Sequence, residues 1–300
     1  MRQIPFSRKP RRIKDGIPRF VPENNYARSF SIEWARHASL RFDSDFVKKK
    51  ILARTGWSTR WLKGKTILEC GCGGGNDTKA LLDLGAQVAA FDLSTGVEQA
   101  KALIGEHPGL LGFFQASIMD IPVKSESFDI VFCHRVLQHT PDPKKAFFEM
   151  ARIVKPGGTL FMHSYDKSWQ NLTHWRYRYR WLTKRMKPET LARLIEKHGP
   201  WLYRLVVWMD RWWLGRAIHH CAIPFWNYER GKMRQEFTRE QRYQWACMNT
   251  FDSLSPAHDH PTHPRTMRRW FEEAGFTRIR LRRRNPVIMI GMKKRKKKKP

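Results

Sequence analysis

The glycine-rich stretch at residues 71–75 restricts the fold of this chain more than any other feature. Four of its five residues are glycine, and it directly follows the apolar run TILEC at residues 66–70. Such a stretch is costly, because glycine loses the most conformational entropy on folding. It predicts a tight turn after a buried strand, or a ligand that lies close to the main chain.

Short apolar runs and helix-like segments alternate through the middle of the chain. The runs are typical of strands buried on both faces of a parallel sheet, and they occupy residues 66–70, 87–92, 112–116, 128–133 and 158–164. Helices are expected between them at residues 77–84, 95–104 and 142–154, with glycines after their ends. The order predicts the α/β class with a Rossmann-like, doubly wound sheet.

The glycine stretch then lies at the carboxyl end of the first of these strands, where sheets of this kind bind ligands. A dinucleotide fingerprint needs glycine at position 76 or 78, and the chain has Asn76 and Thr78. The GKT tripeptide at residues 64–66 lacks the upstream glycine of a phosphate-binding loop, because position 59 is Thr59. NAD, FAD and nucleoside triphosphates are therefore disfavoured.

Two carboxylates accompany the glycines. Glu69 precedes them, and Asp92 ends the second strand. A carboxylate in the latter position can accept hydrogen bonds from both hydroxyls of a ribose lying across the strand ends. The pattern predicts a nucleoside ligand without a pyrophosphate.

Four segments resemble, in order and spacing, the class I S-adenosylmethionine-dependent methyltransferases, especially the type 11 group that includes quinone-pathway enzymes. They read TILECGCGGG, VAAFDLSTGVEQAK, MDIPVKSESFDIVFCHRVLQHTPDPKKAFFEMARIVKPGGTLFM and WFEEAGFTRIRLRRRNPVIMIGM. The resemblance covers roughly residues 60–165 and 270–292. It implies S-adenosylmethionine as the cofactor and a methyltransferase sheet with a helical insertion before a C-terminal antiparallel hairpin.

The resemblance also implies the cofactor contacts. The glycine turn would lie against the methionine and ribose, Asp92 would hold the ribose, and Glu69 would support the amino group. Where the family often has an aspartate near the adenine, this chain has Ser117 followed by Ile118. The full implied set is Glu69, Gly71, Cys72, Gly73, Gly75, Asp92, Leu93, Ser117, Ile118, Cys133 and His134.

Some relatives carry E-x-x-E-H after the fourth strand, whereas this chain has RVLQH at residues 135–139. A hard divalent cation has no carboxylate cage there, so no metal is expected. His139 is the first candidate for a general base, since the loop after the fourth strand faces the cofactor in this family. It also suits a structural histidine in the turn before Pro141.

The segment FDSLSPAHDHPTH at residues 251–263 is expected to form a loop. Its histidines suggest a metal cluster, but the prolines and the lack of helical spacing argue against one. Asp259 or His260 is a candidate for a group that contacts the acceptor or acts as a base. The loop resembles one before the final helix in a branch of bacterial type 11-like enzymes.

We expect the chain to consist of five regions. Residues 1–60 are expected to form a basic arm and helical lid, 61–165 the cofactor-binding core, and 166–250 a helical insertion rich in Trp and Arg. Residues 251–292 would complete the core, and 293–300 would be a disordered polybasic tail. The insertion suits either a cap whose aromatic side chains pack inward or a surface that meets a membrane interface.

The net charge of the chain indicates what kind of partner it attracts. The net charge is +30 and the sequence pI about 10.5, which predicts attraction to a polyanion. Five cysteines without a C-x-x-C pair suit a reducing compartment. With neither an export signal nor a spanning segment, a cytoplasmic protein is expected, with peripheral contact at the inner face of an anionic membrane as an alternative.

The sequence therefore predicts an enzyme that methylates a small-molecule, lipid-linked or glycan acceptor. An RNA or other nucleic-acid methyltransferase is the alternative suggested by charge. It is disfavoured because the chain lacks an N/D-P-P-Y/F/W motif after the fourth strand and has no Pro-Cys pair. A non-catalytic binding protein on the same fold is a further alternative.

Overall fold

The computed structural model describes residues 4–36, 43–169, 173–230 and 232–295. Its contacts divide the chain into two compact units. We call residues 1–25, 41–167 and 258–300 the core unit, and residues 26–40 and 168–257 the helical unit. The helical unit therefore takes in most of the predicted insertion together with a short piece of the predicted N-terminal lid.

The core unit is built on one sheet. Its strands are β1 Arg12–Lys14, β2 Ile17–Arg19, β3 Thr66–Cys70, β4 Gln87–Asp92, β5 Leu110–Gln115, β6 Phe128–Cys133, β7 Val154–Ser164, β8 Phe276–Arg283 and β9 Val287–Lys293. They lie in the order β1-β2-β5-β4-β3-β6-β7-β9-β8. Strands β3 to β7 pair in parallel, while β9 pairs antiparallel to both β7 and β8. This confirms the predicted doubly wound sheet and its C-terminal hairpin.

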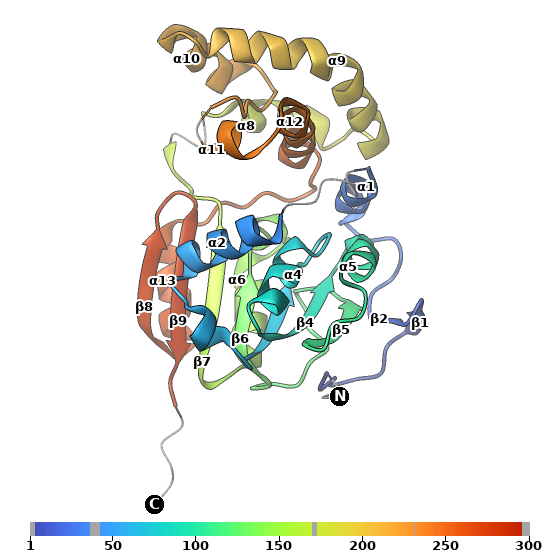
Figure 1. Cartoon of the computed structure of the whole chain (residues 1–300), viewed down its shortest axis with the longest axis vertical. Helices are drawn as coiled ribbons and strands as arrows, with labels where there is room; N and C mark the ends of the chain where they lie inside the picture. The colour runs from blue at the N-terminus through green and yellow to red at the C-terminus, as the bar shows by residue number, and fades with distance from the viewer. Residues whose placement is uncertain (1–3, 37–42, 170–172, 231, 296–300) are drawn as a thin grey trace, which may run out of the picture. The chain divides into compact units, whose positions relative to one another are not determined.

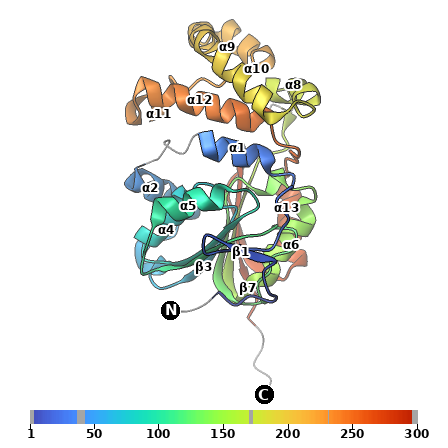
Figure 2. The same ribbon diagram turned by 90° about the vertical axis from the view of Figure 1, so that its right-hand side faces the viewer.

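Helices cover both faces of this sheet (Figure 1). The helices are α2 Ser44–Thr55, α3 Thr59–Leu62, α4 Asn76–Asp83 and α5 Gly96–Ile104 on one face, and α6 Pro143–Ile153 and α13 Pro264–Glu273 on the other. Figure 2 shows α4 and α5 on the opposite side of the sheet from α6 and α13. The central strands β3, β4 and β6 are therefore almost entirely buried, which explains their largely apolar sequences.

Helix ends follow local chemistry. At the start of α6, the Asp142 side chain accepts a hydrogen bond from the Lys145 amide, and Pro143 occupies the first turn. Gly105 ends α5 in a positive-φ conformation. These signals explain why the predicted helices end within about a residue of the observed ones.

Strand β7 begins four residues before its predicted start at Gly158. The pairing with β6 jumps from Phe128–Val154 to Ile130–Thr159, so the additional residues are accommodated as an irregularity within the strand. The KPGG segment was expected to terminate a helix, and it also forms the entry to the strand.

The N-terminal segment extends the sheet. Strands β1 and β2 form a hairpin, and β2 pairs with β5 at Arg19 and Gln115. Arg19 is 2% exposed, and its guanidinium donates to Gln115 Oε1 at 2.9 Å and Glu98 Oε1 at 2.6 Å. The region predicted as one arm and lid is thus divided: the hairpin, α2 and α3 belong to the core unit, and α1 Arg28–Arg36 belongs to the helical unit.

The helical unit has a hydrophobic core of its own. It contains α1, α8 Trp175–Thr183, α9 Pro188–Met209, α10 Trp213–Ala222, α11 Lys232–Glu236 and α12 Arg239–Leu254. Trp175, Tyr203, Val206 and Phe225 are buried together in this core. The insertion is therefore helical, as predicted, and part of its aromatic content packs inward.

Two boundaries differ from the prediction. Helix α12 continues to Leu254, so residues 251–254 are helical and the predicted loop starts at Ser255. Lys293 belongs to β9, where its ammonium donates to the carbonyls of Ala151 and Val154 at 2.9 and 3.0 Å. The polybasic segment therefore starts with an ordered lysine, and residues 296–300 lie outside the described part of the chain. Within that part, no helix combines the length and apolar character needed to cross a bilayer.

Candidate functional site

The candidate site lies where the strand order of the sheet reverses. The chain proceeds outward from β3 to β4 and β5, then returns to place β6 on the other side of β3. The loops after β3 and β6 consequently leave the sheet side by side. Gly71 has φ 79°, and a Cβ on it would lie 2.3 Å from Val136 Cγ2 in the loop after β6. Only glycine fits this contact.

Asp92 connects the glycine turn to the end of β4. Its Oδ2 accepts a hydrogen bond from the Gly73 amide at 2.8 Å. Its Oδ1 accepts from the amide and hydroxyl of Ser94 at 2.7 and 2.6 Å. Burial raises the pKa of Asp92, while these hydrogen bonds oppose the rise.

The residues at this position fit the sugar of a nucleoside. The Asp92 carboxylate remains partly exposed, at the carboxyl ends of the strands. A carboxylate offers about four acceptor positions, so Asp92 can bind a ribose hydroxyl in addition to its present donors. Gly73 and Gly75 also have positive φ, so the main chain of the turn carries no side chain toward this carboxylate.

Glu69 lies beneath the turn, at 2% exposure. Its Oε2 accepts a hydrogen bond from Thr78 Oγ1 at 2.5 Å, which links β3 to α4. Desolvation raises the pKa of Glu69 to about 8, and the charge of Asp77 adds to the rise. The side chain therefore carries a proton over most of the neutral range.

A half-buried polar relay lies beside the turn, and of its three residues only His134 was predicted from the sequence. Arg54 Nη1 lies 2.7 Å from His134 Nε2, and His134 Nδ1 is hydrogen-bonded to Asp77 Oδ2. Because arginine can only donate, Nε2 must be the acceptor and Nδ1 must carry the proton. Desolvation lowers the pKa of His134, which agrees with a neutral imidazole between the guanidinium and the carboxylate.

The pKa of Arg54 is also lowered, to about 10, mainly by desolvation. Arg54 ends α2, far from the motifs in sequence, and no local pattern marks it as a site residue. Asp77 carries a weak signal, since it is an acid in the first turn of the helix that follows the glycines.

The structure brings His139 and the predicted acceptor loop together. His139 Nδ1 lies 3.2 Å from the His258 carbonyl, and the His260 amide donates to the Gln138 carbonyl at 2.7 Å. His139 is 6% exposed and packs edge-on against Tyr165. The candidates on both loops, including Asp259, therefore belong to one cluster at this edge of the sheet.

The loop after β6 contains a residue with a strained backbone. Arg135 has φ 63°, a left-handed conformation that a residue with a side chain adopts at a cost of about 1–3 kcal/mol. The Gln138 side chain donates to the Arg135 carbonyl at 2.9 Å. This hydrogen bond helps to hold the turn that follows β6.

The remaining predicted residues closely follow the carboxyl ends of β4 and β5. Ser117 Oγ accepts from the Met119 amide at 3.1 Å, and Ile118 is buried. The Leu93 carbonyl accepts from Gln115 and Asn25 at 2.8 and 3.3 Å.

The cysteines near the turn are buried thiols. Burial raises the pKa of Cys72, and it raises that of Cys133 to about 12. Both therefore stay protonated at neutral pH and are poor nucleophiles. All five cysteines of the chain are free, and the described residues contain no group of three or more His, Cys, Asp and Glu side chains arranged for a metal.

A glycine turn at the switch point of a parallel sheet, bonded to an acid at the end of the next strand, defines a nucleoside-binding α/β domain. The family model described as a methyltransferase domain, of the type 11 group, matches residues 68–162. The core unit is therefore a class I S-adenosylmethionine-dependent methyltransferase domain, and its cofactor is S-adenosylmethionine.

Curated relatives match about a third of the chain. A ubiquinone biosynthesis O-methyltransferase of Coxiella burnetii is 34% identical over 110 residues, covering 36% of this chain and 47% of the relative. That of Xanthomonas oryzae is 36% identical over 109 residues, covering 36% of this chain and 46% of the relative. The chain thus spans about half the length of the curated relatives it matches. A solved S-adenosylmethionine-dependent methyltransferase from Mesorhizobium loti is 15% identical with a TM-score of 0.48, covering 84% of this chain and all of that one.

Proposed function

We propose that the chain transfers the methyl group of S-adenosylmethionine to a small-molecule, lipid-linked or glycan acceptor. The observation that carries this proposal is the hydrogen bond from Gly73 to Asp92 at the switch point of the sheet. It joins the two elements that would hold the methionine and ribose portions of the cofactor.

In this reaction the protein would mainly position the reactants, because the methyl donor is already reactive. S-adenosylmethionine, when bound, supplies a methyl group already activated on a sulfonium. The residues of the chain have to align the acceptor and exclude water. The half-buried Arg54–His134–Asp77 relay suits the orientation of the polar end of the cofactor, because a guanidinium pairs well with a carboxylate.

We propose a hydroxyl as the acceptor group. The curated relatives are named O-methyltransferases, and a weakly acidic hydroxyl requires a base. If His139 Nδ1 donates its proton to the His258 carbonyl, Nε2 is the nitrogen that can accept a proton. Asp259 and His260, on the adjoining loop, are the proposed acceptor contacts.

The methyl-donor proposal is tested by replacing Asp92. We expect Asp92→Ala to weaken binding of S-adenosylmethionine by about 1.5–3 kcal/mol, since a charge-assisted ribose contact is lost. Isothermal titration calorimetry measures the affinity. Asp45→Ala is the matched control, because Asp45 lies on the surface of α2 and pairs only locally with Lys48. Equal cofactor affinity in Asp92→Ala and the unmodified protein would contradict the assignment.

The role of His139 has a separate test. We expect His139→Gln to lower kcat by about 10²–10⁴-fold if the residue acts as a general base, while the affinity for S-adenosylmethionine stays nearly unchanged. Turnover is measured on a panel of phenolic and lipid-linked acceptors, with thermal unfolding as the control for folding. A parallel loss of cofactor affinity and turnover would show that His139 is structural.

We further propose peripheral contact with an anionic membrane, favoured by one observation on the helical unit. Helix α10 has no buried residue, and it carries exposed Trp213, Leu214 and Ile218. Tryptophan and cationic side chains together suit the headgroup boundary of a bilayer. Such contact would place the protein beside a lipid-linked acceptor.

A further inference from the structure

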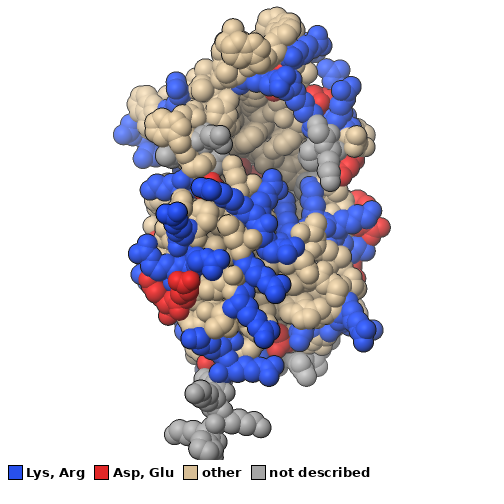
Figure 3. Space-filling model, turned by 90° about the vertical axis from the view of Figure 1, so that its left-hand side faces the viewer, with Lys and Arg blue, Asp and Glu red and all other residues tan. Residues whose placement is uncertain are grey.

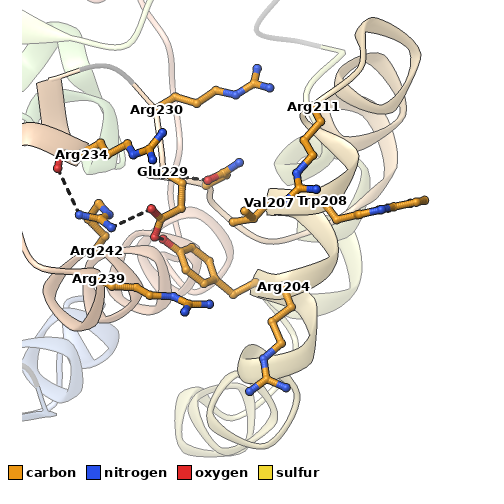
Figure 4. Close-up of a pocket in the computed structure, with 11 residues that line it drawn as sticks. Arg204, Val207, Trp208, Arg211, Glu229, Arg230, Arg234, Arg239 and Arg242 are labelled. Carbon is orange, nitrogen blue, oxygen red and sulfur yellow. Dashed lines mark hydrogen bonds and ion pairs between the residues drawn. The ribbon is translucent and has the colours of Figure 1, made fainter.

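The helical unit contains a pocket of about 670 Å³ that the methyl-transfer chemistry does not use. Five segments line it: α9, the turn after α9, the stretch between α10 and α11, α11 itself and the beginning of α12 (Figure 4). All of them belong to the same unit. The pocket is therefore a property of that unit alone.

Arginine dominates the lining. The pocket is lined by six arginines and one acidic residue, Glu229; the arginines are Arg204, Arg211, Arg230, Arg234, Arg239 and Arg242. Residues 204, 208 and 211 are spaced so that they lie on one face of a continuing helical turn. Figure 4 shows side chains of α9 on one wall, and those of α11 and α12 on the other.

The single carboxylate is already neutralised. Glu229 Oε2 pairs with Arg242 at 2.8 Å, and Glu229 Oε1 accepts from the Tyr203 hydroxyl at 2.9 Å. The backbone amide of Glu229 donates to the Asn227 side chain at 2.9 Å, and the Asn227 amide donates to buried Asp210 at 2.7 Å. This network orders the part of the pocket around Glu229, and the Arg242 guanidinium is already paired within it.

The other five arginines are not paired in this way, although the charge of Arg239 also helps to lower the pKa of Glu229. Among the described residues, no ion pair or side-chain hydrogen bond involves the guanidinium of Arg204, Arg211, Arg230, Arg234 or Arg239. Five like charges around one concavity repel one another and raise the local concentration of anions. An anionic ligand that enters the pocket relieves this repulsion and gains charge-assisted hydrogen bonds.

We infer that this pocket binds a phosphate or diphosphate group of a small ligand or lipid headgroup. A phosphoryl group presents several oxygens to the planar fork of arginine, which binds them in pairs. A single carboxylate would neutralise only one of the five charges, so a multiply charged group fits better. The volume exceeds what one phosphate needs, and Trp208 at the rim offers an apolar surface to the rest of the ligand.

The test uses the full chain and inorganic pyrophosphate, with inorganic phosphate as a second probe. We expect calorimetry to show saturable binding of pyrophosphate, tighter than that of phosphate and weakened by salt. Arg211→Gln or Arg234→Gln should each weaken pyrophosphate binding by about 10-fold, and the double variant by about 100-fold. The two residues lie on opposite walls, so their joint effect reports on the pocket.

Arg193→Gln is the matched control. Arg193 is an exposed arginine of α9 that does not line the pocket, and it contacts only Thr190 nearby. It should leave pyrophosphate affinity unchanged, and all variants should keep the affinity for S-adenosylmethionine. Equal weakening by Arg193→Gln, or no binding of pyrophosphate at low salt, would overturn the inference.

Further binding measurements distinguish a lipid headgroup from a free phosphorylated ligand. Soluble short-chain phosphatidic acid tests a lipid headgroup, with short-chain phosphatidylcholine, a zwitterion of zero net charge, as the comparison. Competition between phosphatidic acid and pyrophosphate supports the pocket and identifies the lipid source, whereas binding of pyrophosphate alone supports a free phosphorylated ligand. Tighter binding of an RNA oligonucleotide that the double variant retains would reject the pocket as the anion site.

Discussion

Glu69 illustrates how a residue chosen from a motif acquires a different character in the folded chain. The resemblance places it near the cofactor amino group, and the structure buries it against Thr78. Its ordinary pKa is 4.5, and burial raises the folded value to about 8. Between these two pH values the folded state holds a proton that the unfolded state has released.

This difference sets the sign of a pH dependence. Glu69 should make the free energy of unfolding fall as the pH rises from about 4.5 to 8. Glu69→Gln removes the titration, so we expect it to stabilise the protein at pH 8 by up to a few kcal/mol, with little difference near pH 5. Urea unfolding at both pH values measures this. Glu106→Gln, at an exposed site, is the control, and an equal effect of Glu69→Gln at both pH values would contradict the buried protonated carboxyl.

Helix α10 shows how an element can pack against its neighbours and still leave large apolar side chains exposed. Trp213 is 77% exposed, Trp212 before the helix is 51% exposed, and Leu214 is 55% exposed. Large apolar side chains gathered in this way mark a surface that contacts something else. Arg211 and Arg216 flank these side chains in the sequence, so the proposed anionic bilayer would meet both apolar and charged groups at α10, which Figure 1 labels.

Replacing the tryptophans tests this surface. We expect the protein to sediment with phosphatidylglycerol vesicles at low salt, and the Trp212→Ser and Trp213→Ser double variant to bind at least about 10-fold more weakly. Trp201→Ser, at an exposed position of α9, is the control. Competitor RNA separates membrane attachment from nucleic-acid attraction. Failure to sediment with anionic vesicles at low salt would reject the membrane proposal.

The molecule carries a large positive charge, and its position on the surface matters as much as its size. The outer strand β8 carries exposed arginines at positions 278, 280, 282 and 283, and Figure 3 shows Lys and Arg across the face that carries it. Charged side chains on an edge strand discourage pairing with a second copy of the sheet. The arginines of the pocket are different, because they converge on one concavity. Net charge alone therefore predicts attraction to anions, and only the arrangement distinguishes a solvated surface from a binding site.

The order and limits of the central strands followed from the sequence. Strands at residues 66–70, 87–92 and 128–133 have the predicted boundaries, because a strand buried on both faces favours a largely apolar run. The glycine turn and Asp92 were also evident, since close backbone contact requires glycine at Gly71, where a side chain would clash with Val136. These are local requirements, and each leaves a mark within a few residues.

Contacts between distant residues were decided by the tertiary structure. Arg54, Asp77 and His134 form one relay across 80 positions, and Arg204, Arg239 and Arg242 line one pocket from two helices. The Arg19 hairpin likewise joins the sheet through Gln115. His134 was implied by the resemblance and Asp77 carried a weak helix-start signal, but no local pattern marks the other residues. Their positions depend on how the helices and strands pack, because hydrogen bonds and ion pairs between far segments form only once loop closure has brought their elements together.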